Sequence, residues 1–150
     1  MSESLTALAR RWMAADPDPH TRAQTEAILA DGSGLVEAFG TRIQFGTAGI
    51  RGRMGPGPAQ MNRAIVRQVT AGLAQYLLKT VPGAAEQGVV IGFDGRHNSL
   101  VFAQDAAAVL SGAGLTVYAF DEVVATPTLS HAVVALGCAA GIMVTASHNP

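Results

Sequence analysis

The second half of the chain alternates short apolar runs with longer helical segments. The apolar runs are residues 89–93 (VVIGF), 115–120 (LTVYAF) and 139–145 (AAGIMVT), and segments 99–110 and 127–136 between them are expected to be helices. Strands that alternate with helices of this length form βαβ units, in which the strands run parallel and helices cover both faces of the sheet. The pattern therefore predicts an α/β domain with a largely parallel sheet.

The first 40 residues are expected to form a helical extension that precedes this domain. Apolar residues at helical spacing predict a helix over residues 3–15, and Asp16-Pro17-Asp18-Pro19 should end it. Thr21 is expected to cap a second helix that reaches about residue 30, and residues 34–39 to add one further turn. After the extension, apolar spacing over residues 62–79 predicts a long amphipathic helix.

Composition narrows the class of protein. Hydrophobic residues make up 49% of the chain and charged residues 14%, which argues against a disordered protein. The net charge is −1 and Lys and Arg form no long run, so neither nucleic acid nor an anionic membrane is expected as a partner. A single cysteine, Cys138, predicts neither a disulfide nor a metal cluster, and the apolar runs are short for a bilayer. A cytoplasmic protein is expected.

A glycine-rich segment lies between the extension and the sheet. Residues 42–58 (RIQFGTAGIRGRMGPGP) contain five glycines and two prolines, and a short strand is expected at Ile43 before the loop. Glycines let backbone amides approach an anion, and Arg51 or Arg53 can hold phosphate oxygens with two parallel hydrogen bonds. The segment matches neither common nucleotide-binding glycine motif, and a plain connection is an alternative.

Ligands of open α/β sheets bind beyond the carboxyl ends of the strands. This rule places residues 92–99 (GFDGRHNS), 121–128 (DEVVATPT) and 145–150 (TASHNP) around one crevice. In the first of these segments, a plain turn closed by Asp94 or Asn98 is an alternative to a binding role.

Ser147 is the candidate nucleophile of the third segment, and two chemistries compete for it. An acyl-transfer triad fits poorly, because no G-x-S-x-G elbow is present and the adjacent His148 side chain should point away from the serine. Phosphoryl transfer fits better, with the phosphoryl group on Ser147 and a substrate proton handled by His148. An ordinary turn is the third alternative.

Three motifs of the chain resemble those of a known family. TASHNP (145–150), FGTAGIRG (45–52) and GFDGR (92–96) resemble conserved loops of the α-D-phosphohexomutase superfamily, the phosphoglucomutases and phosphomannomutases. The residues before and after the glycine-rich segment are similar to the branch that contains phosphopentomutase-type phosphoglucomutases. The resemblance covers almost all of the chain.

The resemblance implies roles for five residues. Ser147 would be the phosphorylated serine, whose phosphate also helps to hold Mg²⁺, and His148 would be a general acid/base. Thr47 and Arg51 of the first loop and Arg96 of the second would bind phosphate. The family moves a phosphate between the C1 hydroxyl and a distal hydroxyl of one sugar (glucose 1- and 6-phosphate, or a mannose or pentose analogue) through a sugar bisphosphate.

The resemblance also implies a fold and a domain. The expected fold is a three-layer α/β/α domain with a mixed four-stranded sheet, formed by residues 41–150 as domain I and cut at the phosphoserine loop. The metal loop, the sugar-specificity loop and the C-terminal domain of such enzymes are not in this sequence, so the chain is expected to be an N-terminal fragment that is inactive alone. A non-catalytic phosphosugar-binding or interaction module is the alternative function.

Overall fold

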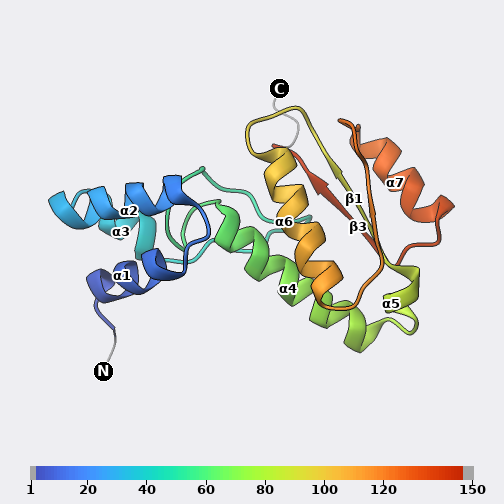
Figure 1. The fold of residues 1–150 in the computed structure, drawn as a ribbon, viewed down its shortest axis with the longest axis horizontal. Coiled ribbons are helices and arrows are strands. Elements are labelled where there is room, and N and C mark those ends of the chain that lie inside the picture. Colours follow the sequence, from blue (N-terminus) through green and yellow to red (C-terminus); the bar gives the residue numbers. More distant parts are fainter. Residues whose placement is uncertain (1–2, 147–150) are drawn as a thin grey trace. The chain divides into compact units, whose positions relative to one another are not determined.

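The computed structural model describes residues 3–146, which divide into two compact units. The first unit ends at Ile65 and the second begins at Val66. Figure 1 shows the helices and strands of both units.

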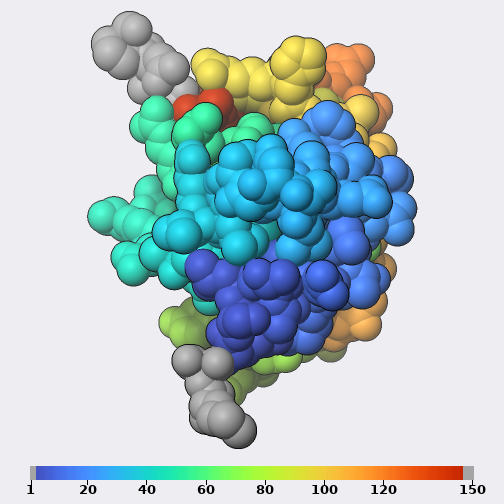
Figure 2. Space-filling view, turned by 90° about the vertical axis from the view of Figure 1, so that its left-hand side faces the viewer, coloured from blue at the N-terminus to red at the C-terminus, as the bar shows by residue number. Residues whose placement is uncertain are grey.

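The first unit is helical, with α1 (Leu5–Ala15), α2 (Pro19–Asp31) and α3 (Leu35–Phe39). These helices share a small apolar core centred on three buried side chains, Ala9, Ala38 and Phe39. Partly buried apolar side chains surround the core: Leu5, Leu8, Trp12, Ile28, Leu29 and Leu35. In the space-filling view the blue and light-blue helices of this unit lie against one another (Figure 2). The unit therefore has apolar packing of its own.

The start of α2 differs from the prediction. The cap is Asp18, whose carboxylate accepts a hydrogen bond from the His20 N–H at 2.9 Å, and Pro19 occupies the first turn. Proline suits that position because its fixed φ is already helical and it has no N–H to satisfy. Thr21 lies inside the helix, buried, and its hydroxyl donates to Asp16 at 2.7 Å. The prediction of Thr21 as the cap was wrong for this reason.

The second unit contains the sheet. Its elements are α4 (Arg63–Thr80), which begins just before the boundary, α5 (Ala84–Gln87), β1 (Val89–Phe93), α6 (Ser99–Gly112), β2 (Val117–Ala119), α7 (Thr126–Ala135) and β3 (Ala140–Val144). The expected alternation of strands and helices is confirmed. Among the described residues, no helix has both the length and the apolar character needed to cross a membrane.

The three strands run parallel in the order β2-β1-β3. Val89 of β1 lies opposite Val117 of β2 and Ala140 of β3, and Phe93 lies opposite Val144. Each crossover carries one helix and returns the chain to the same end of the sheet, which makes all neighbours parallel. The parallel sheet predicted from the alternation is confirmed.

The mixed four-stranded sheet implied by the resemblance is not supported within residues 3–146, where the sheet has three parallel strands. The strand expected at Ile43 is likewise absent from the described residues. That region forms isolated single bridges instead, Phe45 with Ile50 and Met54 with Met61. Closely spaced glycines and prolines do not sustain a ladder, because glycine weakens a strand and proline cannot donate to it.

Helices cover both faces of the sheet. Val89, Ile91 and Phe93 of β1 belong to one buried cluster that also contains side chains of α4 and α6: Ala74, Leu77, Ala103, Ala106 and Leu110. On the other face the sheet has Gly92 and Gly141 beside α7. A methyl group at Gly92 would lie 2.7 Å from the Leu129 side chain, so α7 packs directly on the backbone. Figure 1 shows α6 and α7 on opposite sides of the strands. The layers are therefore α/β/α.

An ion pair joins α4 to α6 beside this core. The Arg67 guanidinium donates from Nη2 and Nε to Oδ1 of Asp105, at 2.6 and 2.9 Å. The Asp105 side chain is 5% exposed and the Arg67 side chain 42% exposed. A buried carboxylate of this kind is tolerated because it is paired and hydrogen-bonded.

We predict that Asp105→Asn lowers the free energy of unfolding by roughly 1.5–3 kcal/mol, the usual value of a hydrogen bond to a charged group. The loss should fall towards the lower figure because Arg67 can turn into water. Chemical denaturation with urea measures it. Glu3→Gln is the matched control, since Arg11 binds Glu3 with similar distances, 2.6 and 3.2 Å, but both side chains are exposed. Equal losses at both positions would contradict the importance of burial.

Candidate functional site

The candidate nucleophile and acid/base, Ser147 and His148, lie outside the described residues. The structure describes the chain up to Ala146, so it shows the frame that directly precedes the serine. The proposed contact of a Ser147 phosphate with a metal lies outside the described residues as well.

At the carboxyl end of β1, the described residues bring together the loop after β1, the segment after β2 and the first residues of the third expected segment. The Phe93 carbonyl accepts from the Val124 N–H at 3.0 Å, which brings the segment after β2 alongside. The Asp94 N–H donates to the Val144 carbonyl at 3.0 Å, which brings in the end of β3. These bonds gather the carboxyl ends of the strands at one edge of the sheet, where ligands bind in folds of this type. The crevice itself stays a prediction, because residues 147–150 of the third segment lie outside the described residues.

The Asp94 carboxylate closes the loop after β1. Oδ1 accepts from the Ser99 hydroxyl at 2.6 Å and from the Arg96 N–H at 3.1 Å, while Oδ2 accepts from the Ala146 N–H at 3.3 Å. Asn98, the other candidate cap, precedes α6 with φ of 64° and makes no capping hydrogen bond with its side chain. Asp94 thus closes the turn, and it also reaches the segment next to the serine.

Opposing effects act on the pKa of Asp94. Burial is the largest and would raise the pKa, because it disfavours the charged form. Hydrogen bonds from the Ser99 hydroxyl, the Arg96 N–H, the Thr145 hydroxyl and the Ala146 N–H act in the other direction, and together they hold the pKa below its ordinary value. Asp94 is therefore a carboxylate at neutral pH.

Arg96 lies at the same edge of the sheet. Its Nε is 3.6 Å from Oδ2 of Asp94, and its side chain is 52% exposed. A half-exposed guanidinium beside the carboxyl ends of the strands can reach an anionic ligand without leaving its loop. Its assignment to phosphate stays a prediction.

The other predicted phosphate ligands, Thr47 and Arg51, lie in the glycine-rich loop of the first unit. The Gly46 N–H donates to the Gly49 carbonyl at 2.7 Å and closes a turn that presents Thr47 to solvent. Arg51 is exposed and follows this turn. Arg53, the alternative arginine, pairs with Glu37 at 2.7 Å. The roles of Thr47 and Arg51 stay predictions.

Asn62 fixes the far end of this loop. Its buried side-chain amide donates to the carbonyls of Gly55, Gly57 and Gln60 at 2.9, 2.8 and 3.2 Å. Its Oδ1 accepts from the Ile65 N–H at 3.0 Å, which caps the first turn of α4. One fully used side chain therefore joins the loop to the start of the helix.

Gly57 explains why the loop needs glycine at this point. Its φ is 81°, and a methyl group there would collide with the backbone carbonyl of Ala38.

The sequence analysis did not predict the contribution of Asn62, although an asparagine directly before an apolar helical pattern is a cap signal. It also missed the second contact of Asp94, for which no local signal exists.

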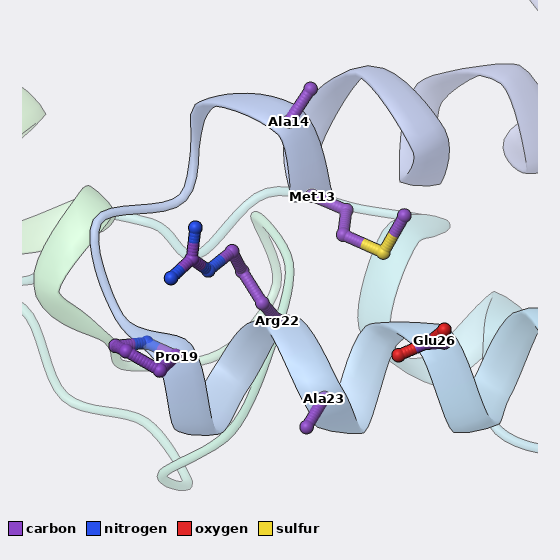
Figure 3. A pocket seen from close by; sticks show the side chains of 6 residues that line it. All are labelled: Met13, Ala14, Pro19, Arg22, Ala23 and Glu26. Carbon is purple, nitrogen blue, oxygen red and sulfur yellow. The ribbon is translucent and has the colours of Figure 1, made fainter.

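A shallow groove of roughly 390 Å³ lies between α1 and α2 (Figure 3). It is lined by Met13, Ala14, Pro19, Arg22, Ala23 and Glu26. No residue of the predicted phosphate site is among them. Nor do the described residues contain a group of three or more His, Cys, Asp or Glu side chains that could hold a metal ion.

Comparison with known proteins gives a family match. The family described as phosphoglucomutase/phosphomannomutase, alpha/beta/alpha domain I, matches residues 42–150. This range includes all three motifs and the whole sheet. No solved structure matches the chain.

Similar proteins have related names. A probable phosphoribomutase of Schizosaccharomyces pombe is 45% identical over 152 residues, covering 100% of this chain and 26% of its own length. A phosphopentomutase of Homo sapiens is 38% identical over 93% of this chain and 24% of its own length. A phosphoglucomutase of Staphylococcus saprophyticus is 51% identical over 72% of this chain and 19% of its own length. The chain thus spans about a quarter or less of these relatives.

We predict that Asn62→Asp destabilises the protein by at least about 2 kcal/mol at neutral pH, because a carboxylate oxygen would face three carbonyls in place of an N–H donor. The capping oxygen is retained, so the cost isolates the loop contacts. Thermal or urea unfolding measures it. Asn98→Asp, at an exposed position, adds the same charge and should stay within about 0.5 kcal/mol. A similarly small effect at position 62 would show that the loop does not depend on these bonds.

The lowered pKa of Asp94 predicts a pH dependence of stability. As pH falls below the ordinary aspartate pKa of about 3.9, Asp94 becomes protonated in the unfolded chain while it stays ionised in the folded protein. Asp94 therefore stabilises the fold above that pH, and this contribution is lost as pH falls through the folded pKa. Carboxyl ¹³C NMR titration should give a pKa below the ordinary value, and Ser99→Ala should raise it. A pKa at or above the ordinary value would contradict the hydrogen-bond geometry.

Proposed function

The chain belongs to the phosphoglucomutase/phosphomannomutase family, and we propose on that premise that the whole protein is a phosphosugar mutase to which these residues contribute domain I. The observation that carries the proposal is the family match over residues 42–150, which contains the glycine-rich loop, the loop after β1 and the serine segment together. We place domain I at residues 41–150, with residues 1–40 as a helical extension.

Ser147 is the proposed carrier of the phosphoryl group. In the first half-reaction the bond between phosphorus and the Ser147 oxygen breaks, and a new bond forms to a free hydroxyl of the sugar monophosphate. The sugar hydroxyl loses its proton to a base, and the serine oxygen regains one. The product is a sugar bisphosphate, which then returns its other phosphoryl group to Ser147. The net reaction is an isomerisation of the sugar monophosphate.

The remaining site residues have matching roles in this proposal. His148 would accept the proton of the attacking hydroxyl and return it in the reverse half-reaction. Thr47, Arg51 and Arg96 would bind phosphate, for which arginine is well suited because its planar fork matches phosphate oxygens. The exposed turn that precedes Arg51 and the position of Arg96 at the sheet edge support these roles. Positioning and charge stabilisation supply most of the catalysis in phosphoryl transfer.

The substrate is proposed to be a sugar 1-phosphate or its isomer. The relatives are called phosphoribomutase, phosphopentomutase and phosphoglucomutase, which supports a pentose or glucose phosphate. The family description also includes phosphomannomutase. We propose a pentose or glucose phosphate ahead of a mannose phosphate, because the names of these three relatives refer to pentose and glucose phosphates.

Mg²⁺ and a sugar bisphosphate are proposed as cofactor and as intermediate or activator. Mg²⁺ prefers oxygen ligands and commonly uses a phosphate oxygen among them, which a phosphorylated Ser147 would supply. The metal loop that the family resemblance implies is proposed to supply the other ligands. The cytoplasm is the proposed location.

We predict that Ser147 of the complete gene product becomes phosphorylated on incubation with glucose 1,6-bisphosphate. Phosphorylation adds about −1.5 to −2 charges at neutral pH, so intact mass and native charge both change. Peptide mapping by mass spectrometry locates the group. Ser147→Ala should remove both the phosphate and the turnover of ribose 1-phosphate and glucose 1-phosphate, while Ser130→Ala, in α7, serves as the matched control. Phosphate found on another residue, with normal turnover in Ser147→Ala, would refute the assignment.

A further inference from the structure

The carboxylate of Asp94 serves two segments that are far apart in sequence. Its Oδ1 binds the N–H of Arg96 and the hydroxyl of Ser99, within its own loop. Its Oδ2 binds the N–H of Ala146, which lies 52 residues further along and directly precedes Ser147. The same side chain thus closes one loop and holds the start of another.

Closing the loop after β1 does not by itself require the contact between Asp94 and Ala146. Asp31 shows what an ordinary turn uses, because its Oδ1 accepts from the Ser33 N–H and hydroxyl at 2.8 Å each, within the same turn. Asp94 repeats this pattern with Oδ1, and its other oxygen is directed at the end of β3. Its side chain is 19% exposed, and burial is compensated by the number of donors around it.

The backbone of Asp94 adds a second point of attachment. Its N–H donates to the Val144 carbonyl at 3.0 Å, and its carboxylate accepts from the Ala146 N–H at 3.3 Å. Residues 144–146 are therefore held at both ends by one residue of the neighbouring loop. The Thr145 hydroxyl also donates to the carboxylate, which fixes the middle of the stretch. The direction in which the chain leaves β3 is set by these bonds.

We propose that Asp94 is a positioning residue for phosphoryl transfer: its carboxylate holds the Thr145 hydroxyl and the Ala146 N–H, in the two residues that directly precede Ser147 in the sequence. The inference rests on the proposed function of Ser147. Reacting groups must be aligned closely, and a displacement of about 1 Å can cost a factor on the order of a hundred in rate. Asp94 acts through the serine segment and contacts no substrate in this role.

Asp94→Asn tests the hydrogen bonds most specifically, because it keeps the size of the side chain and changes only its charge and its acceptors. The amide has one oxygen, so it cannot accept hydrogen bonds on both sides at once. Its NH₂ group would then face either the Ala146 N–H or the donors of its own loop. Asp94→Glu keeps the charge but displaces the carboxylate by one methylene, and provides a second variant that is more tolerant in folding. Asp31→Asn is the matched control, since it alters a similar turn in the helical unit.

The test is single-turnover phosphorylation of the complete gene product by glucose 1,6-bisphosphate, followed by rapid-quench mass spectrometry. A folding defect lowers the amplitude, because fewer molecules react, whereas a positioning defect lowers the rate constant. We expect Asp94→Asn to lower the rate constant about ten- to a hundredfold. Asp94→Glu should lower it by less, and Asp31→Asn should leave it unchanged. Hydrogen exchange at the Ala146 amide should accelerate in both Asp94 variants.

The outcomes separate the two proposals. If wild-type protein is phosphorylated on Ser147 and Asp94→Asn changes only the amplitude or nothing, the positioning role is overturned while the mutase proposal stands. If the wild-type protein is not phosphorylated on Ser147, the proposed function itself fails and the positioning role with it. An Ala146 amide that exchanges equally fast in wild type and Asp94→Asn would also overturn the inference.

Discussion

Complete burial of the central strand is the constraint on which the sheet unit depends. Every residue of β1 is buried, with parallel strands on both sides and helices on both faces. Side chains of β1 that point one way join α4 and α6, while on the other face α7 lies close to the backbone of Gly92. Because β1 carries only apolar residues along its buried length, the polar groups next to it lie in the loops at its ends, where ligands of such sheets bind.

Asp94 fixes the loops that meet at the carboxyl end of β1. It is the first residue after β1, so its backbone can continue the pairing with β3 while its carboxylate turns back towards two loops. Hydrogen bonds to an ionised group are stronger than neutral ones, which favours a carboxylate at this junction. In the helical unit, Asn62 fixes the glycine-rich loop in a similar way. Its neutral amide suits this position because its partners are three carbonyls and one N–H.

Local sequence patterns predicted the helices and strands, which depend mostly on neighbouring residues. They did not predict the contacts between residues far apart in the sequence. The alternation of apolar runs and helices indicated the parallel sheet, and the motifs indicated the family. The cap of α2 was misplaced because Pro19 outweighs Thr21 as a start signal, and the strand at Ile43 was overestimated because glycine and proline outweigh a few apolar residues. The fourth strand came from resemblance alone. The bond from Asp94 to Ala146 has no local signature, since it exists only once β1 and β3 are paired.

In the proposed reaction, Ser147 passes a phosphoryl group to a sugar monophosphate and takes another back from the bisphosphate. A rapid-quench chase tests it most directly: the complete gene product, carrying ³²P on Ser147, is mixed with ribose 1-phosphate or glucose 1-phosphate and Mg²⁺. If Ser147 is the carrier, label moves into a sugar bisphosphate with a rate constant at least as large as kcat. Label that stays on the protein, or leaves as inorganic phosphate while turnover continues, would contradict it.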